Sequence, residues 1–123
     1  MFLQLGHTKL PLFQSSRELC LECYKATKEF PPDEKFAMVQ QIRRAAVSVH
    51  LNIAEGSSRK SAVERKRFYE ISRGSVIEID TALDLAVELT YCTKESLIIL
   101  GEKLVSTFKQ LSALINYQAN TNK

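Results

Sequence analysis

The sequence is poor in the residues that interrupt helices. Four of its 123 residues are glycine and three are proline. Apolar runs typical of β-strands are also few. These shortages argue against a fold rich in strands or long loops and favour helices. The length suits one domain with one sizeable core, so we predict a single domain over residues 1–123.

Long apolar runs are missing as well. No stretch approaches the roughly 18 apolar residues that a membrane-spanning helix needs. The first six residues carry no basic segment followed by a long apolar one, so they do not resemble a signal peptide. We therefore expect a cytoplasmic protein that does not bind a membrane.

Residues with the spacing required for catalysis or metal binding are scarce. Cys20 and Cys23 match C-x-x-C, but no second pair of ligands follows at the spacing of a structural zinc site. His7 and His50 are far apart in sequence, and no Glu-x-x-His pair, glycine-rich phosphate loop or nucleophile elbow occurs. We expect no enzyme activity, no cofactor and no metal, and we interpret the two cysteines and His50 as packing residues.

Apolar residues recur every three or four positions along most of the chain, which predicts helices at about residues 11–29, 33–57, 61–90 and 94–118. Pro11 suits the first turn of a helix. Asp33 and Thr93 are expected N-caps, and Ser61 with Glu64 has the spacing of a capping box. Short connections between four amphipathic helices predict an all-α fold, an antiparallel up-down four-helix bundle. Residues 1–9 would be a lead-in, and residues 119–123 a frayed tail.

The third helix is expected to turn one face toward the core. Ile77 falls on the opposite, polar face, where it would be a contact if a partner covered it. The residues predicted to face the core are Phe68, Ile71, Ser75, Ile79, Ala82, Leu83 and Ala86.

Positive charge is concentrated in the middle of the chain. Between Arg43 and Arg73 there are eight basic and three acidic residues, an excess of five, whereas the whole chain has an excess of three. Such a local excess can indicate an anionic partner, although charged residues on a solvated helix face are also routine. The eight candidate nucleic-acid-binding residues are Arg43, Arg44, Arg59, Lys60, Arg65, Lys66, Arg67 and Arg73.

The second predicted helix has an apolar arc that covers nearly half its circumference. This width favours burial on two sides, by the bundle itself and by another subunit. Asn52 and Glu55 are interpreted as structural polar residues that fix the register of an interface. Glu55 and Arg59 are spaced for an ion pair, and Gly56 would allow a neighbouring helix to approach closely.

Several motifs between residues 30 and 79 resemble one protein family, the four-helix-bundle proteins encoded in intervening sequences of 23S rRNA genes. The similarity extends more weakly to the first and last helices. His50, Leu51 and Ser72 depart from the family pattern, which affects packing only. The motifs are Phe30-Pro31, Gln41 to Ser48, Asn52-Ile53-Ala54-Glu55-Gly56 with Arg59, and Arg67-Phe68 followed by Gly74-Ser75 and Glu78.

The resemblance implies an up-down bundle that assembles into a ring, commonly a homopentamer, with basic surfaces that bind RNA or DNA. Related bundles include the accessory variability determinant of diversity-generating retroelements, which also binds a reverse transcriptase.

Two functions stay open on the sequence. One is an oligomeric nucleic-acid-binding accessory protein that contacts phosphates at the corner between the second and third helices. The alternative is a non-catalytic scaffold for protein interactions, for example an accessory subunit of a reverse transcriptase. Phe68 and Tyr69 are too few aromatic residues near this corner to indicate a stacking platform for single strands.

Overall fold

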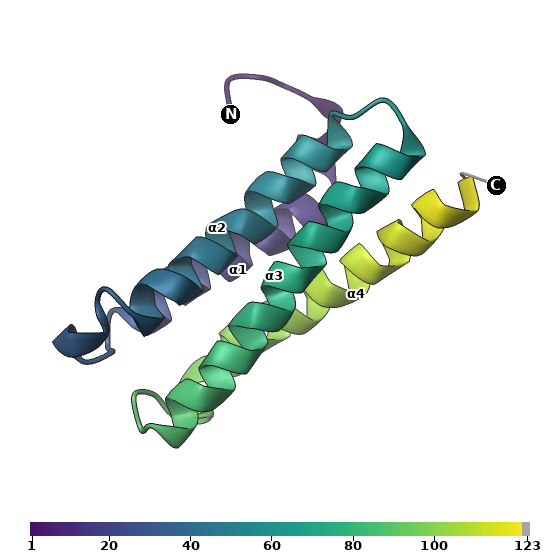
Figure 1. Ribbon diagram of the computed structural model, residues 1–123. Helices are drawn as coiled ribbons and strands as arrows, with labels where there is room; N and C mark the ends of the chain where they lie inside the picture. Colours follow the sequence, from purple (N-terminus) through teal and green to yellow (C-terminus); the bar gives the residue numbers. More distant parts are fainter. Residues whose placement is uncertain (122–123) are drawn as a thin grey trace.

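The computed structural model describes residues 1–121 and contains no strand in that range (Figure 1). Short 3-10 turns lie at Gly6–Lys9, Pro32–Glu34 and Glu95–Leu97. The four helices are α1 (Pro11–Thr27), α2 (Met38–Ser57), α3 (Ala62–Glu88) and α4 (Ile98–Thr121). The predicted all-α fold of four helices is confirmed.

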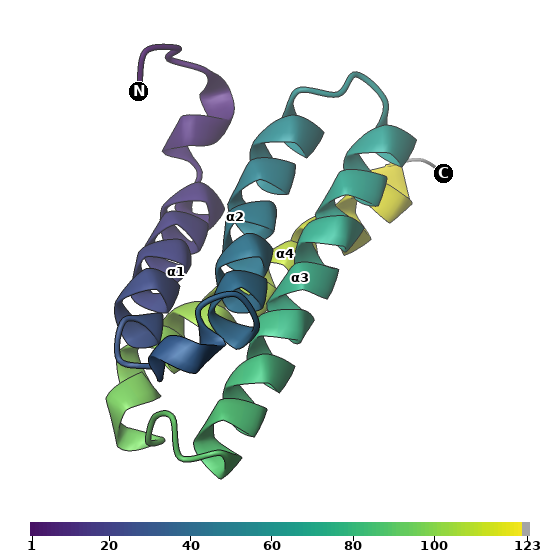
Figure 2. The same ribbon diagram turned by 60° about the vertical axis from the view of Figure 1, so that its left-hand side comes forward.

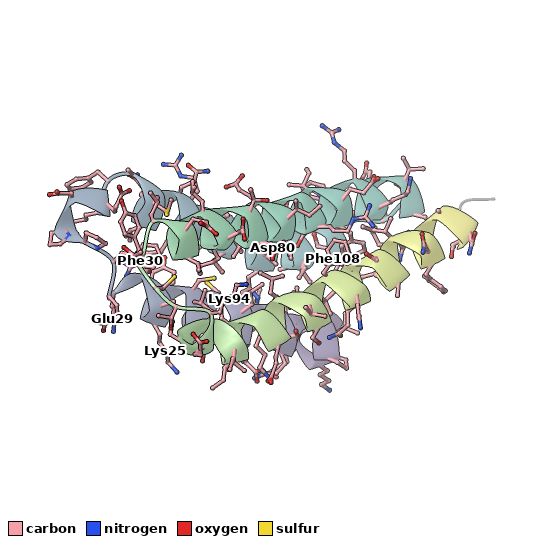
Figure 3. The ribbon with its side chains drawn as sticks, turned by 90° about the horizontal axis from the view of Figure 1, so that it is seen from below. Lys25, Glu29, Phe30, Asp80, Lys94 and Phe108 are labelled. Atoms are coloured by element: carbon pink, nitrogen blue, oxygen red, sulfur yellow. The ribbon has the colours of Figure 1, made fainter. Side chains whose placement is uncertain are left out.

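Neighbouring helices in the sequence are also neighbours in space, and α4 closes the bundle against α1. Figures 1 and 2 show each helix running back along the one before it, so that the connections alternate between the two ends. Phe30, after α1, and Lys94, before α4, therefore lie at the same end of the bundle (Figure 3). The α2–α3 connection lies at the opposite end.

Local signals explain both ends of α3. At its start the Ser61 hydroxyl accepts a hydrogen bond from the Glu64 amide at 3.1 Å, as the capping-box spacing predicts. At its end the Tyr91 amide donates to the Ala86 carbonyl, and the Thr90 amide donates to the Val87 carbonyl. This Schellman arrangement places Thr90 at φ 64°, a left-handed conformation in which glycine is usual and a β-branched residue is strained.

The start predicted for the second helix is wrong. α2 begins at Met38 rather than at residue 33, and Asp33 makes no capping bond because Pro32–Glu34 forms a separate 3-10 turn. A hydrogen bond from the connection between α3 and α4 explains the difference. The Tyr91 hydroxyl donates to the Glu34 carboxylate at 2.8 Å, and that carboxylate also accepts from the Met38 amide at 3.2 Å.

The remaining helix ends differ less from the prediction. α1 stops at Thr27 and α3 at Glu88, each two residues early, and α4 begins at Ile98. Residues 119–121 are helical, so the frayed tail is wrong for them, and residues 122–123 lie outside the described range. Gln118 is 5% exposed and accepts a hydrogen bond from Arg65 Nε at 3.0 Å, which fixes this last turn to α3.

In the first half of α3, the residues predicted to face the core each precede the buried residue by one position. Ile71 is 45% exposed, and Ser72 is buried in its place. Ser72 donates to the Val49 carbonyl of α2 at 2.8 Å, so its hydroxyl is hydrogen-bonded although it is buried. The small side chain also lets α2 and α3 pack closely. The buried residues of α3 are Tyr69, Ser72, Val76, Ile79, Leu83 and Ala86, whereas Phe68 and Ser75 are half-buried.

Within residues 1–121, no helix is both long enough and apolar enough to cross a membrane.

Candidate nucleic-acid interface at the α2–α3 corner

The structure does not bring the eight basic residues into one patch. Five of them, Arg59, Lys60, Arg65, Lys66 and Arg67, lie around the connection between α2 and α3, which we call the α2–α3 corner. Arg43 and Arg44 lie in the first half of α2. At 1.5 Å per residue, Arg44 is about 18 Å from Gly56 at the corner. Arg73 is near the middle of α3.

Arg65 holds the corner in place. Its guanidinium donates to the carbonyls of Arg59 and Lys60 at 3.1 and 2.7 Å, and its Nε donates to the Gln118 side chain at 3.0 Å. One half-buried cation thus fixes the backbone of the connection and the end of α4. Arg65 is therefore a structural residue of the corner, which its position in the sequence did not reveal.

The other corner residues differ in how much charge they present to solvent. Arg59 pairs with Glu55, as the spacing predicts, and its guanidinium lies 4.9 Å from the centre of the Phe68 ring. Lys66 is 4.0 Å from Glu70, at the limit of an ion pair.

Lys60 and Arg67 are exposed, and neither forms an ion pair with any residue in the part of the chain that the structure describes. These two side chains, with Lys66 beside them, present the available positive charge of the corner.

The three basic residues away from the corner also differ in how far their side chains are bonded to neighbouring groups. Arg43 donates from Nε to the Thr27 hydroxyl at 2.8 Å, and its guanidinium covers the Tyr24 ring at 4.7 Å. Arg73 donates to the Ser112 hydroxyl of α4 at 3.2 Å. Arg44 is exposed on α2.

Of the residues assigned to structural roles, Gly56 lies where α2 and α3 meet. A Cβ added to Gly56 would lie 2.9 Å from the Phe68 Cβ and from the Tyr69 ring, so the two helices meet closely here. The Asn52 amide donates to the Ser48 carbonyl and hydroxyl, and the Ser75 hydroxyl of α3 donates to the Ser48 hydroxyl. Ile77 is 52% exposed on the outer face of α3, on the side that the sequence predicted.

His50 connects α2 with α1. Its ring stacks on the buried Phe13 ring with centroids 4.2 Å apart, and its Nδ1 lies 2.6 Å from the Ser16 hydroxyl oxygen. Ser16 donates its own proton to the Phe13 carbonyl, so Nδ1 carries a proton and donates to Ser16. Burial, and then the charge of Arg17 and the proximity of His7, lower the pKa of His50.

Acid is expected to destabilise the protein through His50. Its pKa is near 6.5 in the unfolded chain and lower in the folded protein, so the unfolded chain binds the proton more readily. The free energy of unfolding should therefore fall as the pH drops below about 6.5. Urea unfolding at pH 7.5 and pH 5.5 measures this change. In His50→Gln the dependence over this interval should weaken, and an unchanged dependence would assign it to other groups.

Cys20 and Cys23 lie within α1, where Cys20 is half-buried and packs against the core. Cys23 is buried, and burial raises the pKa of its thiol to about 12, which keeps it protonated at neutral pH. Across residues 1–121, no group of three or more histidine, cysteine or acidic side chains is placed to hold a metal ion.

The chain belongs to a family of four-helix proteins. Residues 8–113 match the family model described as 23S rRNA-intervening sequence protein, so most of the chain carries the family pattern.

A solved structure supports the same fold. A protein of unknown function from the S23 ribosomal protein family of Bacteroides thetaiotaomicron superposes with a TM-score of 0.75 at 22% sequence identity. The match covers 85% of this chain and 97% of that one. No curated protein matches the sequence significantly.

Proposed function

We propose that the protein is an oligomeric, non-catalytic accessory protein that binds RNA or DNA through phosphate contacts at the α2–α3 corner. The observation that carries this proposal is the rigid corner itself. Arg65 ties the connection to α4, while Lys60 and Arg67 extend into solvent with Lys66 beside them. Cations held on a fixed backbone bind a polyanion with little loss of conformational freedom.

Repetition would increase this modest charge. The outer face of α3 exposes Ile71, Ile77 and Leu85, each 45–52% exposed. Apolar side chains on one helix face support self-association. A ring, in keeping with the pentamer that the sequence resemblance implies, would present the corner several times, and several weak phosphate contacts would then act together.

Charge reversal at the corner tests the proposal. The variant Lys60→Glu/Lys66→Glu/Arg67→Glu leaves Arg65 and its hydrogen bonds intact, so the fold is preserved. We expect its affinity for a labelled structured RNA to fall at least about tenfold, measured by fluorescence anisotropy over a salt series. The slope of log affinity against log salt should also become shallower by about 2.7 for each corner that is engaged, which is about 0.9 for each of three lost phosphate contacts.

The matched control carries the same change in charge away from the corner, in Lys25→Glu/Lys94→Glu/Lys109→Glu. It should retain clearly more affinity than the corner variant. Equal losses in the two variants would show that net charge, not the corner, determines binding. Light scattering on the same samples should give a mass that is a multiple of the 14.0 kDa chain.

The alternative is a scaffold whose partner is a protein, such as a reverse transcriptase. The exposed apolar face of α3 also supports this function, since it could cover a partner as well as a second copy. An oligomer that ignores RNA and DNA at physiological salt would favour the scaffold, and Ile77 would then be the first residue to replace.

A further inference from the structure

A second basic surface lies away from the corner, where the first turns of α2 meet the end of α1. A hollow of about 450 Å³ opens there, lined mainly by Tyr24, Lys35, Phe36, Gln40, Arg43 and Arg44. We call it the α1–α2 hollow. Three of its side chains are cationic and its lining includes no carboxylate. Four other hollows on the described surface each include at least one carboxylate. One of them adjoins the α1–α2 hollow and shares Phe36 and Arg44 with it, and its carboxylate, Glu34, is already bonded to Tyr91 and Met38.

Phe36 is the most unusual side chain of the hollow. It is 82% exposed at the rim, just before α2, and the Lys35 ammonium lies 5.4 Å from the centre of its ring. Folding therefore gains almost nothing from this ring, which leaves a flat apolar surface available to a ligand. Tyr24 supplies a second aromatic ring in the lining.

Two of the three cations around these rings, Arg43 and Arg44, are hydrogen-bonded to neighbouring groups. Arg43 is fixed by its bonds to Thr27 and to the Tyr24 carbonyl, so its guanidinium stays over the Tyr24 ring. The Gln40 amide, in the orientation that satisfies its hydrogen bonds, donates to the Phe36 carbonyl at 3.3 Å and accepts from Arg44 at 3.2 Å. Arg44 is thereby tied to Gln40, which is also part of the lining.

We infer that the α1–α2 hollow binds an unpaired nucleotide of single-stranded nucleic acid, with the base stacked on Phe36 and the flanking phosphates contacted by Lys35 and Arg44. Exposed aromatic rings next to cations are the usual means of holding single strands. The volume lies within the roughly 300–1,000 Å³ of small-ligand sites. The inference rests on the proposed function and adds an unpaired nucleotide to its ligands.

The chemistry separates this site from the α2–α3 corner. A base inside a duplex is stacked between its neighbours and cannot reach Phe36, whereas phosphates are available in both forms. The corner should therefore bind duplexes and single strands alike. Stacking on Phe36 in the hollow should add affinity for single strands alone.

Replacement of Phe36 gives a direct test, because its exposure means that the fold does not depend on it. In Phe36→Ala, affinity for a 12-nucleotide oligo-uridine should fall roughly 5- to 150-fold, the loss expected for one stacked base. Affinity for an RNA duplex of equal length should not change. Leu51→Ala, at an apolar position on α2 that is 60% exposed and lies outside the hollow, is the matched control and should bind both as the unchanged protein does.

A fluorescent variant reports on the stacking itself. The chain has no tryptophan, so Phe36→Trp introduces a single fluorophore at the site. Oligo-uridine should quench the emission of this tryptophan. The affinity of Phe36→Trp for oligo-uridine should equal that of the unchanged protein or exceed it. Oligo-thymidine in a parallel titration distinguishes DNA from RNA as the source of the nucleotide.

Three outcomes would overturn the inference, and they differ from failure of the proposed function. Unchanged oligo-uridine affinity in Phe36→Ala would exclude stacking while leaving the corner intact. If Phe36→Ala changed the molecular mass of the protein in solution but not its affinity for oligo-uridine, another copy of the chain would be what covers the hollow. Binding of an acidic peptide in place of oligo-uridine would assign the cations to a protein partner. If neither RNA nor DNA binds the unchanged protein, the proposed function itself fails.

Discussion

Replacing Phe13 with alanine is expected to lower the free energy of unfolding by about 3–5 kcal/mol. The ring is 2% exposed in α1 and is surrounded by other planar groups. His50 stacks on it at 4.2 Å, His7 meets its edge at 5.0 Å, and the Arg17 guanidinium lies 5.4 Å from its centre. Alanine would leave a cavity and would remove the surface against which the imidazole of α2 is held.

Urea unfolding followed by circular dichroism measures this loss. Phe36→Ala is the matched control, because it removes the same side chain from a position that is 82% exposed. Its free energy of unfolding should stay within about 0.5 kcal/mol of the unchanged protein. If the free energy of unfolding fell by less than about 1 kcal/mol in Phe13→Ala, the helices α1 and α2 would have moved together to fill the cavity. The Phe13 ring would then not be essential to their packing.

Gly56→Ala should lower the free energy of unfolding by about 1–3 kcal/mol, although alanine normally stabilises a helix. The added methyl would lie 2.9 Å from the Phe68 Cβ and 2.9 Å from Tyr69 Cε1. The Phe68 Cβ is fixed by its backbone and Tyr69 is 3% exposed, so neither can move without shifting α3. The helix pair must therefore separate at the corner.

Gly74→Ala is the control for this prediction. It makes the same change within α3, where nothing lies within 4 Å of the added Cβ. Here the helix preference for alanine should raise the free energy of unfolding by about 0.5–1 kcal/mol. Thermal or urea unfolding of the two variants side by side checks the sign of each effect. If both substitutions stabilised the protein, the contact between α2 and α3 at Gly56 would be able to accommodate a methyl group without strain.

The fold was predictable because each helix carries its own pattern. The number of helices, the capping role of Ser61 and the outward position of Ile77 all follow from local spacing. The start of α2 was not predictable, because Tyr91, 57 residues from Glu34, fixes the preceding turn. Ser72 in the core was missed for a related reason, since its hydroxyl is satisfied by a carbonyl of another helix.

The candidate site was predictable only in outline. Spacing identified a basic corner and the Glu55–Arg59 pair. It could not distinguish Arg65, which is bonded to Gln118 some 53 residues later, from its exposed neighbours Lys60 and Arg67. The α1–α2 hollow was missed altogether, because Tyr24 and Phe36 come together only after the chain reverses between α1 and α2.

The seam between α1 and α4 has a consequence for the order of folding. The Ser15 and Thr107 hydroxyls are hydrogen-bonded at 2.7 Å across 92 residues, and Lys103 pairs with Glu18 beside them. The α2–α3 hairpin, by contrast, closes over residues 58–61 alone, at a much smaller entropic cost. The hairpin should therefore form early and the seam last. Substitutions in the seam would then mainly accelerate unfolding and leave the folding rate nearly unchanged, so the seam sets the lifetime of the folded protein.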